Sequence, residues 1–426
     1  LALIIWTFNW GALHIAAPVL LLWAFTGSIT AWLNAPPREQ HARIKSADEI
    51  FLRRQALRIW RFYAEFCSER HNHLIPDHVE EAELYEAPRV STTNIGMLLN
   101  ARQAAAELGF VTAPEFAHLT RQTLATLHKL EKRNGHPYNW YHTETLAPLL
   151  PITISSVDNG NLAASLYTLR AGALQMLDLP LLRPQLFSGL HAHWQLLLLQ
   201  KGLPDQITGQ RLPAADAGIE QWTAWTLQME STDALALSTN PHGSNLTGEA
   251  AWWLRETRQR ILSINLLIRR YQPWLLPEFA SLRSLPELAI DLNAPLPLAV
   301  ALDYAIGLQL RFDQPSSAVT EQLHALLPDA IDQLRALNDS LQTIADEAFQ
   351  LASQMDFSLL LDKRRKLLSI AYDVESETLR AETYDMLASE ARIATFLAIA
   401  KGDIPQQSWF RLARTHTIAF DRPVLL

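Results

Sequence analysis

Two short stretches of the chain hold the residue types that bind sugars. "GHPYNWYHTETL" sets Tyr138, Asn139 and Trp140 together, and "SSVDNGNLA" follows with Asp158 and Asn161. Aromatic rings stack on the apolar C–H faces of sugars, while amides and carboxylates hydrogen-bond to the hydroxyls. The same residue types also form half-buried edges of protein cores. Composition alone therefore leaves both interpretations open.

The overall composition argues against several other functions. The chain has 426 residues, 49% hydrophobic content and a net charge of −8. That length can bury a sizeable core, and the absence of a basic excess disfavours nucleic-acid binding. Cys67 is the single cysteine and is expected to be an inert, half-buried thiol. The three histidines of "HNHLIPDH" match no standard metal spacing, so we expect neither a metal nor a cofactor.

The first 37 residues have the composition of a membrane-spanning segment. No Asp, Glu, Lys or Arg occurs among them. A span takes about 20 helical residues, and the most compact candidate runs from His14 to Leu33, with Trp23 and Trp32 as interfacial anchors. Basic residues follow directly, which favours the cytoplasmic side for the rest of the chain. The alternative is a secretory signal peptide, but no charged start or small-residue cleavage site is evident.

Helical periodicity dominates the rest of the chain. Apolar residues recur at helical spacing in three stretches, and a further helix is expected from about Asn159 to Met176; the three stretches are 50–63, 95–108 and 116–130. Gly109 and Gly135 stand where helix C-caps are expected. The loops between these helices carry the polar and aromatic clusters. A regular scaffold with specific loops is typical of an enzyme.

The segment from Leu179 to Met355 differs in character, because its leucine-rich helices carry few distinctive polar clusters. Leucine, alanine and methionine recur every seven residues from Leu327 to Met355. This heptad pattern predicts one long helix packed against a partner, with Pro328 in its first turn. We expect this segment to be structural.

Two elements are predicted after this segment. "FSLLLDKRRKLLSIAYDVESETL" has two apolar runs around a charged turn, which predicts a hairpin turning at "LDKRRK". "RAETYDMLASEARIATFLAIAKGDIP" predicts one long helix that ends near Gly402.

Three long blocks resemble the central part of cyclic β-1,2-glucan synthases. They are "STTNIGMLLNARQAAAELGFV", "LHKLEKRNGHPYNWYHTETLAPLLPITISSVDNGNLAASLYTLRAG" and "FSLLLDKRRKLLSIAYDVESETLRAETYDMLASEARIATFLAIAKGDIPQQSWFRLAR". The resemblance covers nearly the whole chain and is loose between Leu179 and Met355. These synthases are large bacterial inner-membrane proteins that join a glucosyltransferase region, a glycoamylase-like cyclisation domain and a phosphorylase-like region. Because the chain starts at Leu1, we expect it to be a piece of such a protein.

The resemblance implies a mainly α fold, a partial (α/α)6 barrel of the six-hairpin glycosidase type. The expected organisation is a transmembrane helix, two parts of the cyclisation domain and a long helical insertion between those parts; the ranges are 1–37, 38–177, 178–355 and 356–426. The implied partners are β-1,2-glucan, the lipid bilayer and the other regions of the same polypeptide. Residues after 37 are then cytoplasmic.

The implied reaction cuts a linear β-1,2-glucan and transfers it onto its own non-reducing end, releasing a ring. Retention in such a transfer needs an acid/base carboxylate and a nucleophilic carboxylate. Glu390 of "LASEAR" is the candidate acid/base, expected on a helix with apolar surroundings that favour its protonated form. Its alternative is an ion-pair partner of Arg392 or Lys401. No second carboxylate fits the nucleophile, because the family blocks of the "FEYLMP" and "ISES" types are absent here.

The remaining site residues are carried over from the family motifs. Candidates for glucan contact at the barrel mouth are Asn94, Tyr138, Asn139, Trp140, Asp158 and Asn161, with Tyr384, Asp385 and Arg392 beside Glu390. Asp158 and Asn161 alternatively cap the helix that begins near Asn159. His142 stands where the family has Asp, a change expected to weaken one sugar contact.

Two rival functions stay open at this stage. One is an inverting β-glucanase on the same barrel, in which water replaces the sugar acceptor and the carboxylates lie farther apart. The other is a membrane-anchored, catalytically incomplete protein that binds glucan or a partner. Ring size and oligomeric state are not determined by the sequence.

Overall fold

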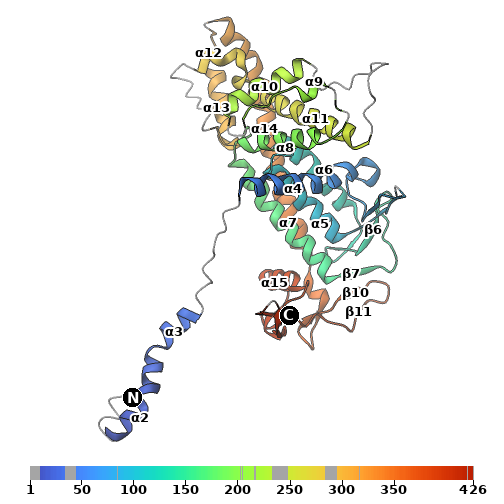
Figure 1. Cartoon of the computed structure of the whole chain (residues 1–426). Helices are drawn as coiled ribbons and strands as arrows, with labels where there is room; N and C mark the ends of the chain where they lie inside the picture. Colours follow the sequence, from blue (N-terminus) through green and yellow to red (C-terminus); the bar gives the residue numbers. More distant parts are fainter. Residues whose placement is uncertain are drawn as a thin grey trace. The chain divides into compact units, whose positions relative to one another are not determined.

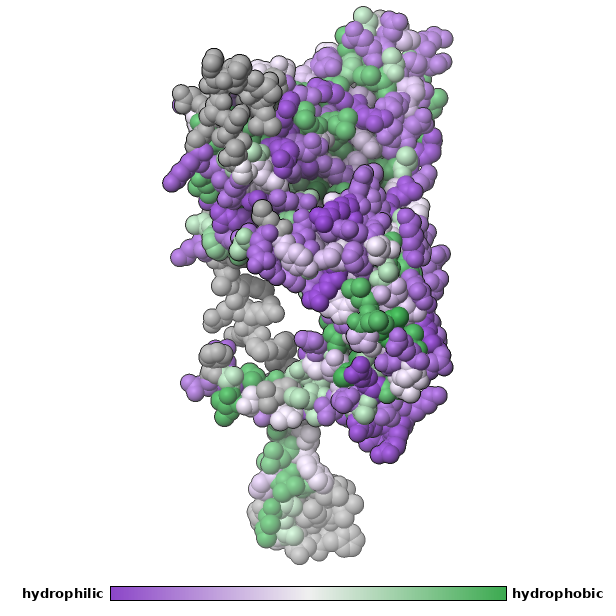
Figure 2. Space-filling view, turned by 90° about the vertical axis from the view of Figure 1, so that its right-hand side faces the viewer, coloured by the Kyte–Doolittle hydropathy of each residue, from purple (hydrophilic) through white to green (hydrophobic). Residues whose placement is uncertain are grey.

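A computed structural model describes residues 10–33, 45–83, 85–201, 203, 205–214, 217–232, 248–283, 295–315, 317–419 and 421–425. The chain forms two compact units, residues 1–49 and residues 50–426. It is mainly helical, which confirms the predicted class. The face of the larger unit drawn in Figure 2 is mostly hydrophilic, with scattered apolar patches.

The described part of the first unit contains the helices α2 (Trp10–Ala24) and α3 (Thr26–Leu33). Their apolar side chains are widely exposed, and Ile15 and Trp32 are 83% and 75% exposed. Among the described residues, no single helix is long and apolar enough to cross a membrane. Together, the two helical segments Ile15–Ala24 and Thr26–Leu33 have the length and composition of a membrane span, but they are bent by 53° at the break between them. The two prolines expected to end the span, Pro36 and Pro37, lie outside the described residues.

The larger unit is built around α7 (Ser156–Leu177), which packs on three other helices (Figure 1); they are α5 (Thr92–Glu107), α14 (Ala318–Gln354) and α15 (Arg392–Lys401). The helix expected to begin near Asn159 is confirmed and begins at Ser156. α4 (Ser46–Phe66) and α6 (Ala113–Lys129) complete this part of the unit. Capping boxes fix the starts of α5 and α6, at Ser91 with Asn94 and at Thr112 with Glu115.

Short antiparallel strands join segments that are distant in sequence. β3 (Arg89–Ser91) pairs with β6 (Trp140–His142). β10 (Ala371–Asp373) lies between β7 (Thr153–Ser155) and β11 (Thr378–Leu379), so the chain after residue 356 joins the start of α7. β7, β10 and β11 lie together with α15 at the lower end of the larger unit in Figure 1.

The other strands form local hairpins. They are β1 (Val79–Glu80) with β2 (Tyr85–Glu86), β4 (Lys132–Arg133) with β5 (His136–Pro137), β8 (Leu361–Asp362) with β9 (Leu367–Leu368), and β12 (His416–Ala419) with β13 (Arg422–Leu425). The hairpin predicted at "LDKRRK" is therefore confirmed as β8–β9.

The segment between α7 and residue 355 is helical, as its composition predicts. Its helices are α8 (Pro184–Leu198), α9 (Asp205–Thr208), α10 (Ile219–Ser231), α11 (Gly248–Tyr271), α12 (Ala280–Arg283), α13 (Leu298–Arg311) and α14. Short 3-10 turns lie at Glu69–His71, Pro273–Leu275, Pro277–Phe279 and Phe357–Leu360, and α16 (Gln407–Arg411) follows α15. The buried heptad face of α14 packs mainly on α7, α13 and α6, which confirms the long packed helix.

Two helix-end predictions were wrong. α14 begins at Ala318 behind a capping box of Ser317 and Thr320, so Pro328 lies inside the helix and not in its first turn. The buried stripe continues upstream through Leu323, which extends the helix past the proline. Gly135 does not cap a helix: with Asn134 it forms the β4–β5 turn, and both have positive φ, 78° and 50°. Gly109, with φ 77°, does follow the end of α5.

The long helix predicted before Gly402 is much shorter. α15 begins only at Arg392, because the preceding backbone pairs with other segments. The Tyr384 amide donates to the Leu368 carbonyl, and the Leu387 amide donates to the Ala413 carbonyl. A backbone that pairs in this way cannot also form the helical hydrogen bonds of a continuous α-helix. Glu390 therefore lies in a turn before α15, which corrects its expected place on a helix.

Candidate functional site

The candidate site lies where the first turns of α5 and α7 meet the paired strands β3 and β6. Ser155 caps α7, since its hydroxyl accepts from the Asp158 amide. The alternative that Asp158 caps this helix is therefore not found, and its carboxylate bonds to other side chains. The pairing of Ser91 with Trp140 brings the β6 strand beside the start of α5.

A continuous chain of hydrogen bonds connects four of the predicted residues. The Thr93 hydroxyl donates to Asp158 Oδ1 at 2.7 Å and accepts from the Asn161 amide at 3.1 Å. In the amide orientation that satisfies both of its neighbours, Asn139 donates to Asp158 Oδ2 at 2.9 Å. It then also accepts from the Trp140 indole N–H at 3.0 Å. The tertiary structure thus brings Trp140, Asn139, Asp158 and Asn161 together in one half-buried network.

The aromatic edge of this network is held by an arginine. The Arg89 guanidinium lies 4.7 Å from the centroid of the Trp140 ring, and it donates from Nη2 to Asp77 Oδ2 at 3.0 Å. A cation over an indole face is attracted by the ring quadrupole. The ring is thus fixed by Arg89 and by its own N–H, while remaining partly exposed.

Tyr384 connects this network to Glu390. Burial raises the pKa of the Tyr384 phenol, and the negative charges of Glu390 and Asp158 raise it further. The Tyr384 phenol therefore feels the charge of both carboxylates. Glu390 is exposed, so the apolar surroundings predicted for it are not found. Among the described residues it forms no ion pair with Arg392 or Lys401, and Lys401 instead pairs with Asp403 at 3.1 Å.

The position of Glu390 depends on close packing between α15 and α7. A Cβ atom placed on Gly160 would lie 2.4 Å from the Ala394 Cβ and 2.8 Å from its Cα. The two backbones approach so closely because neither residue has a large side chain. Ala394 is one turn after Glu390, and Gly160 is two residues after Asp158. This contact therefore holds the start of α15 against the first turns of α7.

We predict that Gly160→Ala destabilises the protein by about 1 to 3 kcal/mol, because the added methyl overpacks the contact with Ala394. The free energy of unfolding in urea, measured by circular dichroism, tests this. Gly218→Ala is the matched control: Gly218 has open space around its Cβ position and a φ of −64°. Equal stability of wild type and Gly160→Ala would contradict the close α7–α15 packing.

The other predicted residues lie in different surroundings. Tyr138 is 5% exposed, stacks on Tyr141 and donates from its hydroxyl to Glu131 at 3.2 Å, so its ring belongs to the core. The Asn94 side chain accepts from the amide and hydroxyl of Ser91 and serves as a helix cap. Asp385 and Arg392 are exposed near Glu390 in sequence.

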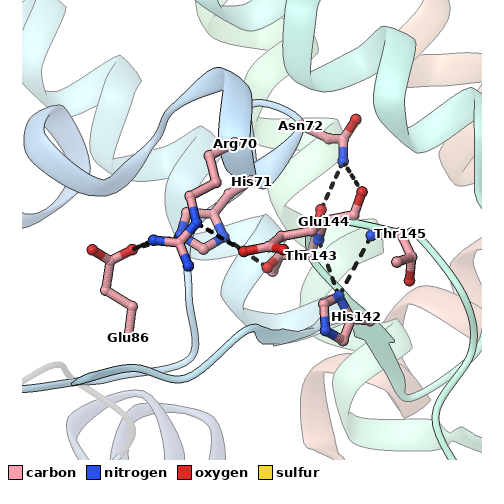
Figure 3. Close-up of polar contacts among 8 residues, drawn as sticks. All are labelled: Arg70, His71, Asn72, Glu86, His142, Thr143, Glu144 and Thr145. Atoms are coloured by element: carbon pink, nitrogen blue, oxygen red, sulfur yellow. Dashed lines mark hydrogen bonds and ion pairs between the residues drawn. The ribbon is translucent and has the colours of Figure 1, made fainter.

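A polar cluster around the buried His71 holds the loop that follows β6 (Figure 3). His71 is 1% exposed; its Nδ1 lies 2.7 Å from the Thr143 hydroxyl and its Nε2 lies 2.7 Å from Glu86 Oε2. Arg70 bonds to Glu144 at 2.8 Å, and the Asn72 amide donates to the carbonyls of Thr143 and Glu144. The turn at Glu69–His71 thereby anchors the strand that carries Trp140.

His142 has a structural role in the same loop. Its Nδ1 accepts from the backbone amides of Glu144 and Thr145, at 3.3 and 3.4 Å (Figure 3). An aspartate at this position would close the same turn through its carboxylate. The His142 ring nitrogen is therefore occupied by the backbone of its own loop.

Sequence analysis missed Thr93 and Arg89, which complete the network. Both belong to "RVSTTNIG", a loop already notable for its polar residues. Their role follows from the pairing of β3 with β6 and from the contact between the starts of α5 and α7. A signal in the sequence pointed to the loop, but not to these two side chains.

The fold and the site together define a mainly helical protein. Its candidate site consists of polar side chains and one partly exposed tryptophan at the N-termini of α5 and α7. A family described as a protein of unknown function, DUF3131, matches residues 55–198. The chain is also 29% identical over 418 residues to the cyclic beta-(1,2)-glucan synthase NdvB of Rhizobium meliloti (strain 1021). That alignment covers 95% of this chain and 13% of the length of NdvB. The match confirms the resemblance to cyclic β-1,2-glucan synthases.

Proposed function

We propose that the chain is part of a membrane-bound cyclic β-1,2-glucan synthase and acts in cyclisation of the linear glucan by retaining transglycosylation. The observation that carries this proposal is the network of Trp140, Asn139, Asp158, Thr93 and Asn161 beside Tyr384 and Glu390. It offers an aromatic face and several hydroxyl-binding groups, and the exposed carboxyl group of Glu390 acts electrostatically on the same Tyr384 phenol as Asp158 does. The similarity to a glucan synthase over 95% of the chain supports the choice of substrate.

In this proposal Glu390 is the acid/base. It donates a proton to the glycosidic oxygen of the bond that breaks, and later takes a proton from the hydroxyl at the non-reducing end that attacks C1. Asp158 is a binding group, because both of its oxygens already accept hydrogen bonds. The nucleophilic carboxylate is proposed to come from a part of the longer synthase outside these 426 residues. No cofactor takes part.

The remaining parts of the proposal concern the scaffold and its location. The paired helices of the larger unit are proposed to form part of an (α/α)6 barrel with a helical insertion. The exposed apolar helices α2 and α3 are proposed to anchor the chain in the bacterial inner membrane, with residues after 37 in the cytoplasm. The bent helix pair, which has the length and composition of a membrane span, supports this anchor.

Replacement of Trp140 tests the binding site. We expect Trp140→Ala to bind linear β-1,2-glucan about tenfold more weakly, since about 1.4 kcal/mol of stacking and C–H contact is lost. Isothermal titration calorimetry measures the dissociation constant. Phe51→Ala, which removes a 58% exposed aromatic side chain of α4, is the control. Equal affinity in wild type and Trp140→Ala would overturn the assignment of the site.

Two alternatives make different predictions for the product. An inverting β-glucanase on the same scaffold would release linear products of inverted anomeric configuration, which proton NMR distinguishes from a ring. A binding protein without turnover would hold glucan and release nothing. Retention, together with a cyclic product, favours the proposed function over both.

A further inference from the structure

A second hollow lies on the larger unit, between α6 and α14 and beside the end of α11. Its volume is about 430 Å³, within the range typical of ligand sites. The buried residues Ala117 and Leu337 form its floor. Leu337 precedes the last residue of α14 by about 17 residues, or about 25 Å along the helix. The end of α14 lies against the β4–β5 hairpin, where the Asp356 amide donates to the Asn134 carbonyl at 3.1 Å. The same hairpin is tied to the first turn of α7, which carries Asp158, because the Asn159 side-chain amide donates to the Pro137 carbonyl at 3.2 Å. The hollow therefore lies about 25 Å along α14 from the end of that helix that faces the candidate site.

Polar side chains line this hollow. The six polar lining residues are His118, Arg121, Gln122, Tyr271, Gln333 and Ser340. Across the described ranges of the chain, only Gln333 among these six makes a side-chain hydrogen bond, at 3.4 Å to Asp329. The side chains of the other five residues can therefore form hydrogen bonds to a ligand in the hollow. The described lining residues include no Asp or Glu, in a chain whose net charge is −8.

We infer that this hollow is an accessory binding groove for β-1,2-glucan, which holds a part of the glucan chain remote from the Trp140 site. The inference rests on the proposed function. A linear glucan whose two ends are joined into a ring must extend beyond the site where the ends react. The sugar residues far from that site can be held by a second binding groove on the protein. A groove about 25 Å along α14 from the helix end at the β4–β5 hairpin supplies one.

The chemistry of the lining favours a sugar over an anion. The two glutamine amides, the Tyr271 phenol and the Ser340 hydroxyl both donate and accept hydrogen bonds, as sugar hydroxyls do. An anion site requires donors alone, and the acceptor oxygens of the two amides would oppose it. The alanines of the lining, Ala117, Ala125 and Ala336, let a sugar ring approach closely, and the Tyr271 ring offers a face for its C–H groups. The groove is open, which suits an extended chain.

The test compares short and long glucans on the 426-residue chain in mild detergent. Isothermal titration calorimetry measures the affinity of a β-1,2-linked trisaccharide and of a linear β-1,2-glucan of about twenty residues. The variants are Arg121→Ala with Gln333→Ala, which alter two partly or fully exposed side chains, and Trp140→Ala. Asp339→Ala, an exposed neighbour on α14 outside the groove, is the control.

We expect the groove variant to bind the long glucan at least fivefold more weakly and the trisaccharide unchanged, with its circular dichroism spectrum and Tm equal to those of wild type. An unchanged affinity for the long glucan would overturn the groove and leave the proposed function intact. If Trp140→Ala loses no affinity for either glucan, the proposed site fails independently. A Tyr271→Phe variant, which removes only the hydroxyl, must reproduce part of the loss; if it binds the long glucan as wild type does, Tyr271 has no place in the groove.

Discussion

Under the proposed function, Glu390→Gln in a full-length synthase that contains this chain is expected to reduce ring formation by about 10²- to 10⁴-fold while linear glucan continues to be made. The amide keeps the size of the side chain but cannot donate a proton to the leaving oxygen. Membranes carrying the variant would be supplied with the sugar-nucleotide donor, and products would be separated by size and tested for a reducing end. Linear chains should accumulate as rings disappear.

The control for this experiment is Glu375→Gln, since Glu375 is an exposed glutamate on the turn between β10 and β11. It should cyclise glucan at the wild-type rate. Ring formation by Glu390→Gln at an unchanged rate would sink the acid/base assignment. Loss of both elongation and cyclisation would instead mean that the variant damages the whole enzyme, and it would also count against a specific role for Glu390.

The second large effect is expected at Glu115, which links α6 to α11. Arg260 donates two hydrogen bonds to this carboxylate, both at 2.7 Å, and Ser263 donates a third at 2.7 Å. Arg260 is 8% exposed. We expect Glu115→Gln to lower the free energy of unfolding by about 3 to 5 kcal/mol, because it leaves a buried guanidinium without its counter-charge. Urea unfolding followed by circular dichroism measures this change.

A surface ion pair provides the matched control. Asp332 and Arg335 form a pair at 3.2 Å with largely exposed side chains. Asp332→Asn should change the free energy of unfolding by less than about 1 kcal/mol, because water already screens the pair. Equal effects of the two substitutions would contradict the buried character of the Glu115–Arg260 pair.

The same carboxylate predicts a pH dependence. Burial opposes ionisation of Glu115, but Arg260, the Thr112 amide and Ser263 outweigh it and lower the pKa to about 2 from 4.5. A pKa lower in the folded than in the unfolded state gives stability that is complete above about pH 5 and lost as the pH falls toward 2. The contribution is about 3 kcal/mol. The stability difference between wild type and Glu115→Gln should therefore shrink over this pH range, and a constant difference would refute the linkage.

Local sequence patterns predicted the regular scaffold well. The apolar periodicity predicted the central parts of the helices α5, α6 and α7, and the heptad pattern predicted the long helix α14. The charged turn gave the β8–β9 hairpin. Each of these patterns depends on contacts within one element or on its one buried face, which the spacing of apolar residues records directly. The three resembling blocks likewise pointed to the loops where the candidate site lies.

Only the tertiary structure decided which of those polar residues meet. Thr93 became the centre of the network because β3 pairs with β6 and α5 packs on α7. Tyr138 is aromatic like Trp140, but its side chain packs in the core, whereas the Trp140 side chain stays partly exposed. Glu390 lost its expected helix because the backbone before Arg392 pairs with Leu368 and Ala413. Such pairings join residues far apart in the chain, and their free energy depends on the fit of whole surfaces. A local pattern of residue types does not predict how well two such distant surfaces fit.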